Sequence, residues 1–99
     1  MELVKMKKIE IVVDNTHLKM VLDILESSGV SGYTVIKDII GKGDRGLVLA
    51  DEPFEGLKNS YLFTVCNDEI ANSVIARIGP LLKRYGGACM VSDVGWLVY

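Results

Sequence analysis

Three glycines, two cations and one acid fall within six consecutive residues near the middle of the chain. The segment reads Gly41-Lys42-Gly43-Asp44-Arg45-Gly46, and it follows a run of β-branched residues that favours an extended, buried strand. Glycine lets a ligand approach the main chain closely, and the two cations place positive charge beside the accessible amides. A strand that ends in such a segment is typical of an anion-binding site. The same glycines could equally begin a flexible loop, because turn chemistry uses the same residue types.

The composition fits one small domain. The chain has 99 residues, and 49% of them are hydrophobic, which is enough for a modest core. Its net charge is −2 and no basic stripe is present, so we expect no nucleic acid as a partner. No apolar run is long enough to span a bilayer, and the N-terminus lacks the pattern of a signal peptide. We therefore expect a cytoplasmic protein.

The chain offers few residues for catalysis or metal binding. Cys66 and Cys89 are far apart in the sequence, and His17 is the single histidine. We expect no zinc site, free thiols that serve as small hydrophobic groups, and an exposed His17. Ser27 and Ser28 have no neighbouring base, and no acid/base pair is visible. The sequence thus predicts a protein without enzymatic activity and without a metal site.

Hydrophobic periodicity predicts the order strand, helix, strand, strand, helix, strand. The predicted elements are a strand at Lys8–Val13, a helix that begins at Asp14–Thr16 and ends at Gly29, a strand at Tyr33–Ile40, a loop from Gly41 to Gly56, a strand at Lys58–Cys66, a helix from Asn67 or Asp68 to Gly86–Gly87, and a strand at Ala88–Ser92 with an apolar tail at Trp96–Tyr99. This order is typical of a ferredoxin-like α+β sandwich, in which both helices cover one face of an antiparallel sheet. With the strands numbered along the chain, the expected sheet order is 4-1-3-2.

Helical spacing predicts which helix residues are buried. The predicted stripes are Leu18, Val21, Leu22 and Leu25 in the first helix, and Ile70, Ala71, Val74, Ile75 and Ile78 in the second. Pro80 should kink or interrupt the second helix, because proline lacks the amide donor.

The topology has two further consequences. Cys66 and Cys89 fall on strands with the first strand between them, about 9.5 Å apart, which is too far for a disulfide. The helices can cover only one face of the sheet, yet the third strand is apolar on both. We therefore expect an exposed apolar face that mediates self-association.

Four segments together resemble a known family. Lys7–Val13, Gly32–Val35, Gly41–Gly43 and Tyr85–Gly87 occur in the order, and near the spacing, of PII-type signalling proteins. The resemblance covers most of the chain. It is nearest to the PII-like branch linked to inorganic-carbon uptake, which includes the carboxysome-associated PII protein and the regulator of the sodium–bicarbonate symporter.

The resemblance implies a homotrimer of ferredoxin-like subunits that binds adenine nucleotides in the clefts between them. Residues 1–99 would form a single PII-like domain with a flexible T-loop at about 43–57. The implied nucleotide contacts are Thr34 and Val12 at the adenine, Gly41, Lys42 and Gly43 along the phosphates, and Gly86 and Gly87 from the neighbouring subunit. Lys42, Gly43 and Arg45 would hold bicarbonate at the base of the T-loop, because a guanidinium suits a planar oxyanion.

Departures from the family pattern narrow the expected function. The loop lacks the tyrosine of the nitrogen-regulatory members, and Arg45 stands near the place of their glutamine. Ala88 follows Gly87 where those members carry a lysine. Because fewer cations weaken the binding of a triphosphate, we favour ADP or AMP over ATP as the ligand, and ATP stays open as an alternative. One extra residue between Thr34 and Gly41 predicts a β-bulge.

The sequence leaves two hypotheses about function. The first is a non-enzymatic regulator without a tightly bound cofactor, which responds to adenine nucleotide and bicarbonate. Its T-loop would contact a membrane bicarbonate transporter or a carboxysome-related target. The alternative is a ferredoxin-like trimer that acts without nucleotide, as an interaction or metal-handling module.

Overall fold

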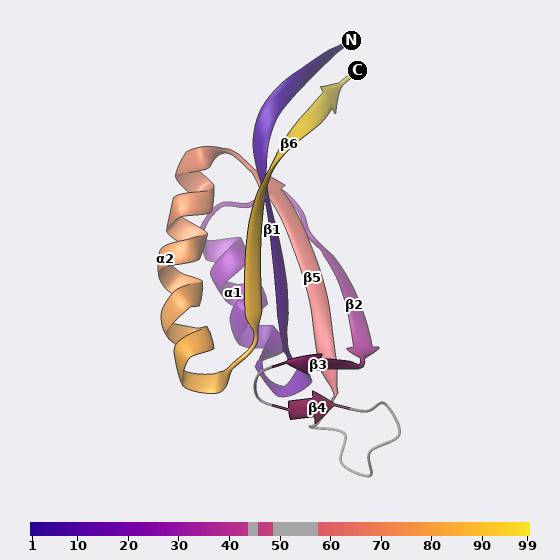
Figure 1. The fold of residues 1–99 in the computed structure, drawn as a ribbon. Coiled ribbons are helices and arrows are strands. Elements are labelled where there is room, and N and C mark those ends of the chain that lie inside the picture. Colours follow the sequence, from indigo (N-terminus) through magenta and orange to yellow (C-terminus); the bar gives the residue numbers. More distant parts are fainter. Residues whose placement is uncertain (44–45, 49–57) are drawn as a thin grey trace.

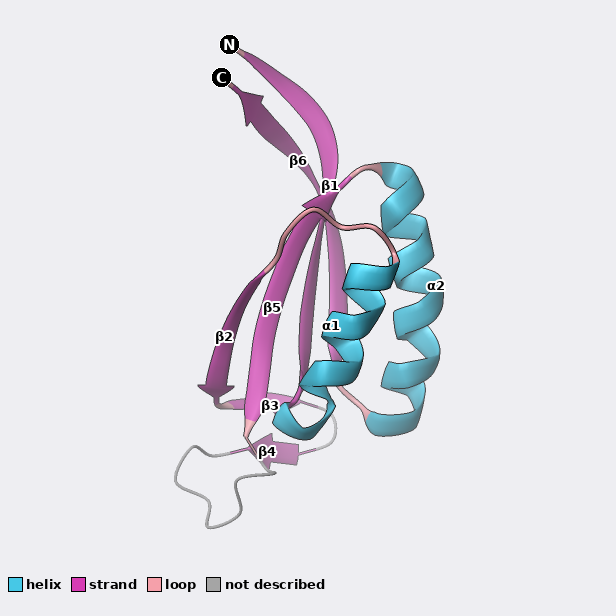
Figure 2. Cartoon of the chain, turned by 180° about the vertical axis from the view of Figure 1, so that it is seen from behind, coloured by secondary structure: helices cyan, strands magenta, loops and turns pink. Residues whose placement is uncertain are grey.

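In the part of the chain that the structure describes, four antiparallel strands form one sheet with two helices on one face (Figure 1). The structure is a computed structural model and describes residues 1–43, 46–48 and 58–99. Its elements are β1 (Glu2–Asp14), the 3₁₀ turn η1 (Asn15–His17), α1 (Leu18–Ser27), β2 (Thr34–Ile39), β3 (Gly41–Gly43), β4 (Gly46–Val48), β5 (Asn59–Cys66), α2 (Asp68–Tyr85) and β6 (Ala88–Val98). The strand order is β2-β5-β1-β6, and both views place the helices on the same side (Figure 2). The predicted ferredoxin-like sandwich and its strand order are confirmed.

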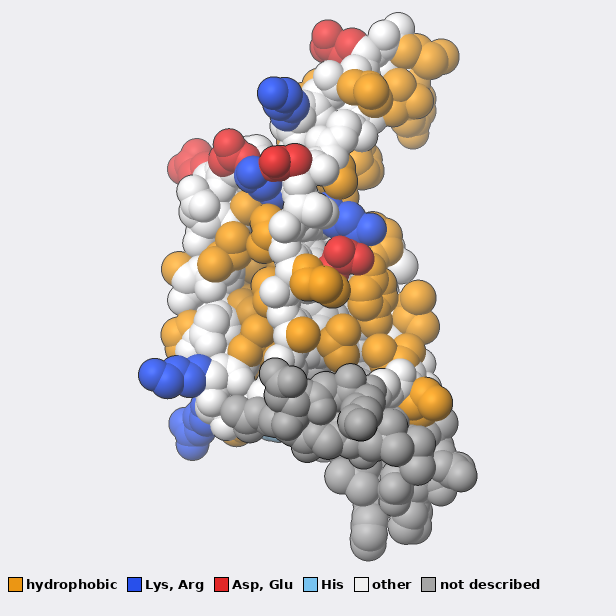
Figure 3. Space-filling view, viewed as in Figure 1, with side chains coloured by type: hydrophobic (Ala, Val, Ile, Leu, Met, Phe, Trp, Pro, Cys, Tyr) orange, Lys and Arg blue, Asp and Glu red, His pale blue; other side chains and the backbone are white. Residues whose placement is uncertain are grey.

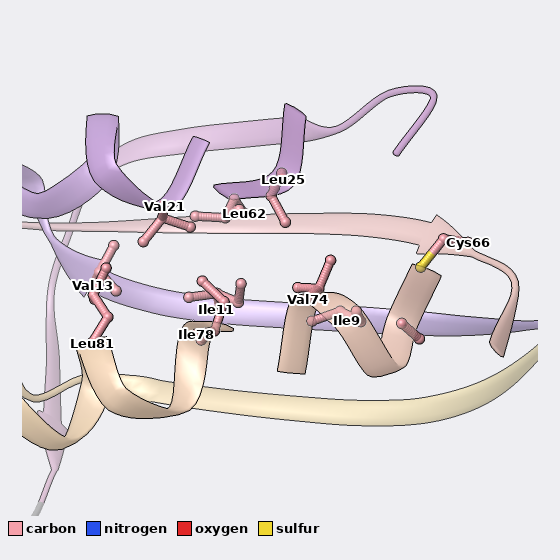
Figure 4. Packing of buried hydrophobic residues seen from close by; sticks show 11 residues of the cluster. Ile9, Ile11, Val13, Val21, Leu25, Leu62, Cys66, Val74, Ile78 and Leu81 are labelled. Atoms are coloured by element: carbon pink, nitrogen blue, oxygen red, sulfur yellow. The ribbon is translucent and has the colours of Figure 1, made fainter. Parts of the chain in front are cut away.

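Alternation along β1 builds the core between the sheet and the helices (Figure 4). Ile9, Ile11 and Val13 point toward the helices and are buried, while the residues between them face the opposite side. Val21 and Leu25 of α1 pack against this row. The full set of buried hydrophobic residues is Ile9, Ile11, Val13, Val21, Leu25, Leu62, Cys66, Ala71, Val74, Ile78 and Leu81. Leu18, Leu22 and Ile70, which the sequence also predicted as core, are partly buried at its border.

The stripe of α2 that faces the sheet differs from the predicted one. The buried residues of α2 are Ala71, Val74, Ile78 and Leu81. Ile75, predicted to be buried, is 41% exposed. It follows Val74 by one residue, and each residue turns about 100° around the helix axis, so its side chain points away from the sheet. Leu81, rather than Ile75, completes the buried stripe of α2.

Pro80 does not interrupt α2, which runs without a break from Asp68 to Tyr85. The predicted interruption is wrong: the φ of proline suits a helix, and neither the lost backbone hydrogen bond nor the clash of the ring with the preceding turn ends this one. Ile78 and Leu81, on either side of Pro80, hold both turns on the sheet. The helix begins at a side-chain cap, where Oδ1 of Asn67 accepts from an amide of the first turn at 2.9 Å.

Beyond the helices, β1 and β6 continue together as a two-stranded arm that ends at the termini (Figure 1). We use the term arm for Glu2–Met6 paired with Val94–Val98. The sequence placed the first strand at Lys8–Val13 and left Trp96–Tyr99 as a tail. Both strands are longer, because each provides the other with hydrogen-bond partners. Leu3 of the arm is 70% exposed, and apolar side chains gather at this end of the molecule (Figure 3).

The predicted bulge in the second strand is confirmed. Between Lys37 and Ile39 the β2–β5 register shifts, so that Asp38 is the extra residue. After β2, Gly41–Gly43 pairs with residues 46–48 as the short ladder β3–β4. The sequence predicted no regular structure there, because a three-residue strand gives no periodicity. Of the predicted T-loop, residues 44–45 and 49–57 lie outside the described residues.

We expect Ile78→Ala to lower the free energy of unfolding by about 2–5 kcal/mol, because it leaves a cavity in the core. Ile75→Ala removes the same atoms from the exposed side of the same helix and should lower it by less than about 1 kcal/mol. Urea unfolding followed by circular dichroism at one protein concentration measures both. Equal losses would show that the orientation of α2 is wrong.

Candidate functional site

Two glycine segments lie at the same end of the sheet, opposite to the termini (Figure 1). Gly41–Gly43 forms β3 after β2, and Gly86–Gly87 joins α2 to β6. β2 and β6 are the two edge strands of the sheet, and β5 and β1 lie between them. Gly41–Gly43 itself lies outside this sheet, because β3 runs from the end of β2 across the end of the sheet (Figure 1). Within one chain, one predicted wall of the nucleotide cleft thus follows one edge strand of the sheet, and the other wall precedes the opposite edge strand.

Gly87 packs against the carbonyl oxygen of Val12. A Cβ atom at Gly87 would lie 2.5 Å from that oxygen, and the residue has a φ of +119°. Gly86 has a φ of +85°, and its N–H donates to the carbonyl of Leu82 at 2.7 Å, which ends α2. Val12 pairs with Ala88 in the β1–β6 ladder. Of the predicted nucleotide contacts, the structure thus groups Val12 with Gly86 and Gly87 in one chain.

Thr34 lies exposed at the first residue of β2, on the same face of the sheet as Val12. Thr34 is opposite Phe63 on β5, and Val12 is opposite Tyr61 on that strand. β5 therefore separates the two predicted adenine contacts by two strand spacings, about 9.5 Å. Gly41 follows the other end of β2, so Thr34 and the predicted phosphate contacts lie far apart along one edge of the sheet.

The predicted anion contacts are only partly described. Lys42 and Gly43 lie in β3, and the ladder pairs are Gly41 with Val48, Lys42 with Leu47, and Gly43 with Gly46. Arg45 lies outside the described residues. The ladder places the backbone of Gly43 opposite that of Gly46, and Gly41 lies two residues along the same strand. The contacts of Lys42 and Arg45 with an anion stay a prediction.

A group of polar side chains that the sequence did not single out lies at the base of this segment. Asn15 of η1 bonds to Asp38 of the bulge and to Ser60 of β5. The bulge itself was visible as an extra residue in the sequence. The bonds were not, because they join residues 23 and 45 positions apart.

His17 is half-buried, whereas the sequence predicted an exposed side chain. Its ring stacks on Tyr85 with a centroid distance of 4.1 Å, and the guanidinium of Arg84 lies 5.2 Å from the Tyr85 ring centre. The start of α1 thus packs against the end of α2, which a reading of each helix alone could not show. This stack lies next to Gly86.

The cysteines lie where the sequence predicted them. Cys66 is on β5 and Cys89 on β6, β1 lies between these strands, and both thiols are free. Burial raises the pKa of both thiols. Within residues 1–43, 46–48 and 58–99, no group of three or more His, Cys, Asp or Glu side chains is placed to hold a metal ion. No helix of these ranges is long and apolar enough to cross a membrane.

The face of the sheet opposite the helices, which we call the open face, is apolar with a polar centre. Ile36 and Met90 are 54% and 53% exposed there. At the centre, the hydroxyl of Tyr61 donates to Oε1 of Glu10 at 2.7 Å, and this bond raises the pKa of Tyr61. Nζ of Lys8 lies 3.6 Å from the same oxygen. Exposed apolar side chains gathered on one face are typical of a protein interface, although here the centre is polar.

A protein-family model matches almost the whole chain. It is described as "Nitrogen regulatory protein P-II", and the match covers residues 6–97. The chain belongs to the P-II family. A search of the curated proteins gave no match. The resemblance carried by the segments from Lys7–Val13 to Tyr85–Gly87 is confirmed.

Solved structures share the P-II fold of this chain. A structure of the PII-like protein CPII from Thiomonas intermedia K12, bound to ADP, AMP and bicarbonate, has a TM-score of 0.89 and 24% identity, and covers 96% of this chain and 91% of that chain. CPII bound to ADP and bicarbonate has a TM-score of 0.85 and 23% identity, with 96% and 91% covered. The Bacillus subtilis GlnK–ATP complex has a TM-score of 0.64 and 16% identity, with 91% and 82% covered. At these identities the comparison concerns the fold.

Gly87→Ala should destabilise the P-II chain more than Gly29→Ala. Both glycines have positive φ, but nothing lies within 4 Å of a Cβ atom at Gly29. Gly29→Ala should therefore cost about 1–2 kcal/mol of backbone strain. Gly87→Ala adds the clash with the Val12 carbonyl, about 1–3 kcal/mol more. Thermal unfolding of the two variants measures the difference, and equal losses would contradict the close approach at Gly87.

Proposed function

We propose that this P-II protein is a non-enzymatic regulator that binds ADP or AMP in clefts between the subunits of a homotrimer. The observation that carries the proposal is that, at one end of the sheet, one glycine segment follows the edge strand β2 and the other precedes the opposite edge strand β6. Each segment is half of a site. A second copy whose β2 edge lies beside the β6 edge of the first would bring the halves together.

In this arrangement one subunit contributes Thr34 to the adenine and Gly41–Gly43 to the phosphates. The neighbouring subunit contributes Gly86 and Gly87, with Val12 beside them. Glycine in these places leaves backbone amides accessible to phosphate oxygens. CPII, which has the same fold, is described as bound to ADP, AMP and bicarbonate, and this supports the choice of ligand.

The open face supports the trimer. Its apolar side chains are exposed in one chain, and burial against other copies would remove them from water. The polar centre fits such an interface, because Glu10 already has partners in Lys8 and Tyr61. A carboxylate that enters an interface with its hydrogen bonds formed avoids much of the cost of an unpaired buried charge.

We propose bicarbonate as a second ligand at the base of the T-loop, held by Lys42, Gly43 and Arg45. The T-loop would then report carbon status to a membrane bicarbonate transporter or a carboxysome-related target in the cytoplasm. A ligand shifts the loop only as far as it binds one loop state better than the other.

Calorimetry with ADP, with and without bicarbonate, tests the ligands. We expect ADP to bind, and to bind more tightly when bicarbonate is present. Arg45→Ala should abolish the bicarbonate effect and weaken ADP binding by about tenfold, because it removes a charged hydrogen-bond donor. Lys19→Ala, which removes one exposed cation from α1, is the matched control and should change neither value.

The outcomes separate the hypotheses. Absence of any adenine-nucleotide binding would overturn the sensor and leave the nucleotide-independent interaction or metal-handling module. An ADP affinity that does not change when bicarbonate is added would overturn only the proposal of bicarbonate as a second ligand. An unchanged bicarbonate effect in Arg45→Ala would place the anion elsewhere.

Light scattering tests the trimer. We expect a mass three times the 10.9 kDa of the chain. Ile36→Glu on the open face should lower the mass toward that of one chain, because it places three charges in the interface. Ile75→Glu, on the exposed side of α2, should keep the trimer. A trimer that survives the first change and not the second would place the interface on the helices.

A further inference from the structure

β2 contains one extra residue, Asp38, shortly before the chain leaves the sheet. The β2–β5 ladder pairs Lys37 with Ser60 and Ile39 with Asn59, so Asp38 has no partner in it. Its φ is +63°, and no other non-glycine residue in the described ranges has a positive φ. Aspartate tolerates this region better than most residues, but the conformation persists only where its surroundings hold it.

A side chain from another element holds this bulge. Nδ2 of Asn15, in η1, donates to Oδ1 of Asp38 at 2.7 Å. Oδ1 of Asn15 accepts from the hydroxyl of Ser60, which is 0% exposed. The carboxylate can only accept, so the amide group of Asn15 has one orientation that satisfies both partners. The backbone of Asn15 is also fixed, since its N–H donates to the carbonyl of Lys58 at 2.9 Å.

We infer that Asn15 is a positioning residue for Gly41–Gly43, and that it acts through Asp38. A one-residue bulge bends the strand and reverses the face to which the next residues point. Only Ile39 and Ile40 lie between the bulge and Gly41, so little chain is left to absorb a change. Asn15 thereby fixes the direction in which the glycine segment leaves the sheet. The inference rests on the proposed function, in which this segment lies along the phosphates.

Two variants of the full chain test the inference. Asn15→Ala and Asp38→Ala each remove one partner of the hydrogen bond that holds the bulge. Each should raise hydrogen exchange of the amides of residues 39–43, without nucleotide, by about tenfold or more, and weaken ADP binding by a similar factor. Their effects should not add, because both remove the same bond. Asp38→Asn keeps a hydrogen-bond acceptor and tolerates positive φ, so its exchange rates and its ADP affinity should stay close to those of the unaltered protein.

Thr16→Ala is the matched control. Thr16 follows Asn15 in η1, and its hydroxyl donates to Asp14 at 2.9 Å without contacting the bulge. This variant loosens the same turn and should leave the exchange of residues 39–43 and the ADP affinity unchanged. Equal effects of Thr16→Ala and Asn15→Ala would overturn the inference in favour of general loosening of the turn.

The two readouts separate this inference from the proposed function. If Asn15→Ala does not fold, because it leaves the hydroxyl of Ser60 unpaired, the exposed Asp38 still allows the test. Unchanged exchange in Asp38→Ala would overturn the role of the bulge, whether or not nucleotide binds. Raised exchange with an unchanged ADP affinity would overturn the positioning role. If the unaltered protein does not bind ADP, both the proposed function and the role of Asn15 in positioning a ligand site are overturned. The exchange measurement would then still decide whether Asn15 holds the bulge.

Discussion

The double pairing of β1 is the constraint on which the rest of the structure depends. This strand pairs with β5 from Lys7 to Asp14 and with β6 from Glu2 to Val12. Because side chains alternate along a strand, its position between two partners commits one set to the core and the other to the open face. The positions of the helices follow, since each buries its apolar stripe against the face that carries Ile9, Ile11 and Val13 of β1.

The same pairing determines what one chain can and cannot assemble. It sets Gly87 against the Val12 carbonyl, where a side chain larger than hydrogen does not fit. It also places β2 and β6 at opposite edges of the sheet, so that one glycine segment follows one edge strand and the other precedes the opposite edge strand at the same end. In the proposed function, a site built from both segments needs two P-II subunits. The apolar open face indicates the same need for a partner.

Local signals predicted much of the fold. The Asn67 cap of α2, the order of the main elements, the sheet order and the bulge between Thr34 and Gly41 followed from residue types, spacing and family resemblance. The predicted helix start at Asp14–Thr16 is instead the 3₁₀ turn η1, and α1 begins at Leu18. The errors have a shared cause. Ile75 fits helical spacing as well as Leu81 does, and the choice between them depends on where the sheet lies. The tail at Trp96–Tyr99 became a strand because its partner comes from the opposite end of the chain.

The sequence by itself determined the order of the two helices and the four strands of the main sheet, the family and the identity of the glycine segments, because each depends on neighbouring residues or on an ordered set of them. The tertiary structure alone decided which residues meet: Val12 with Gly87, His17 with Tyr85, and Asn15 with Asp38 and Ser60. These contacts join positions far apart in the chain. Their geometry depends on strand pairing and helix packing, which no local pattern specifies.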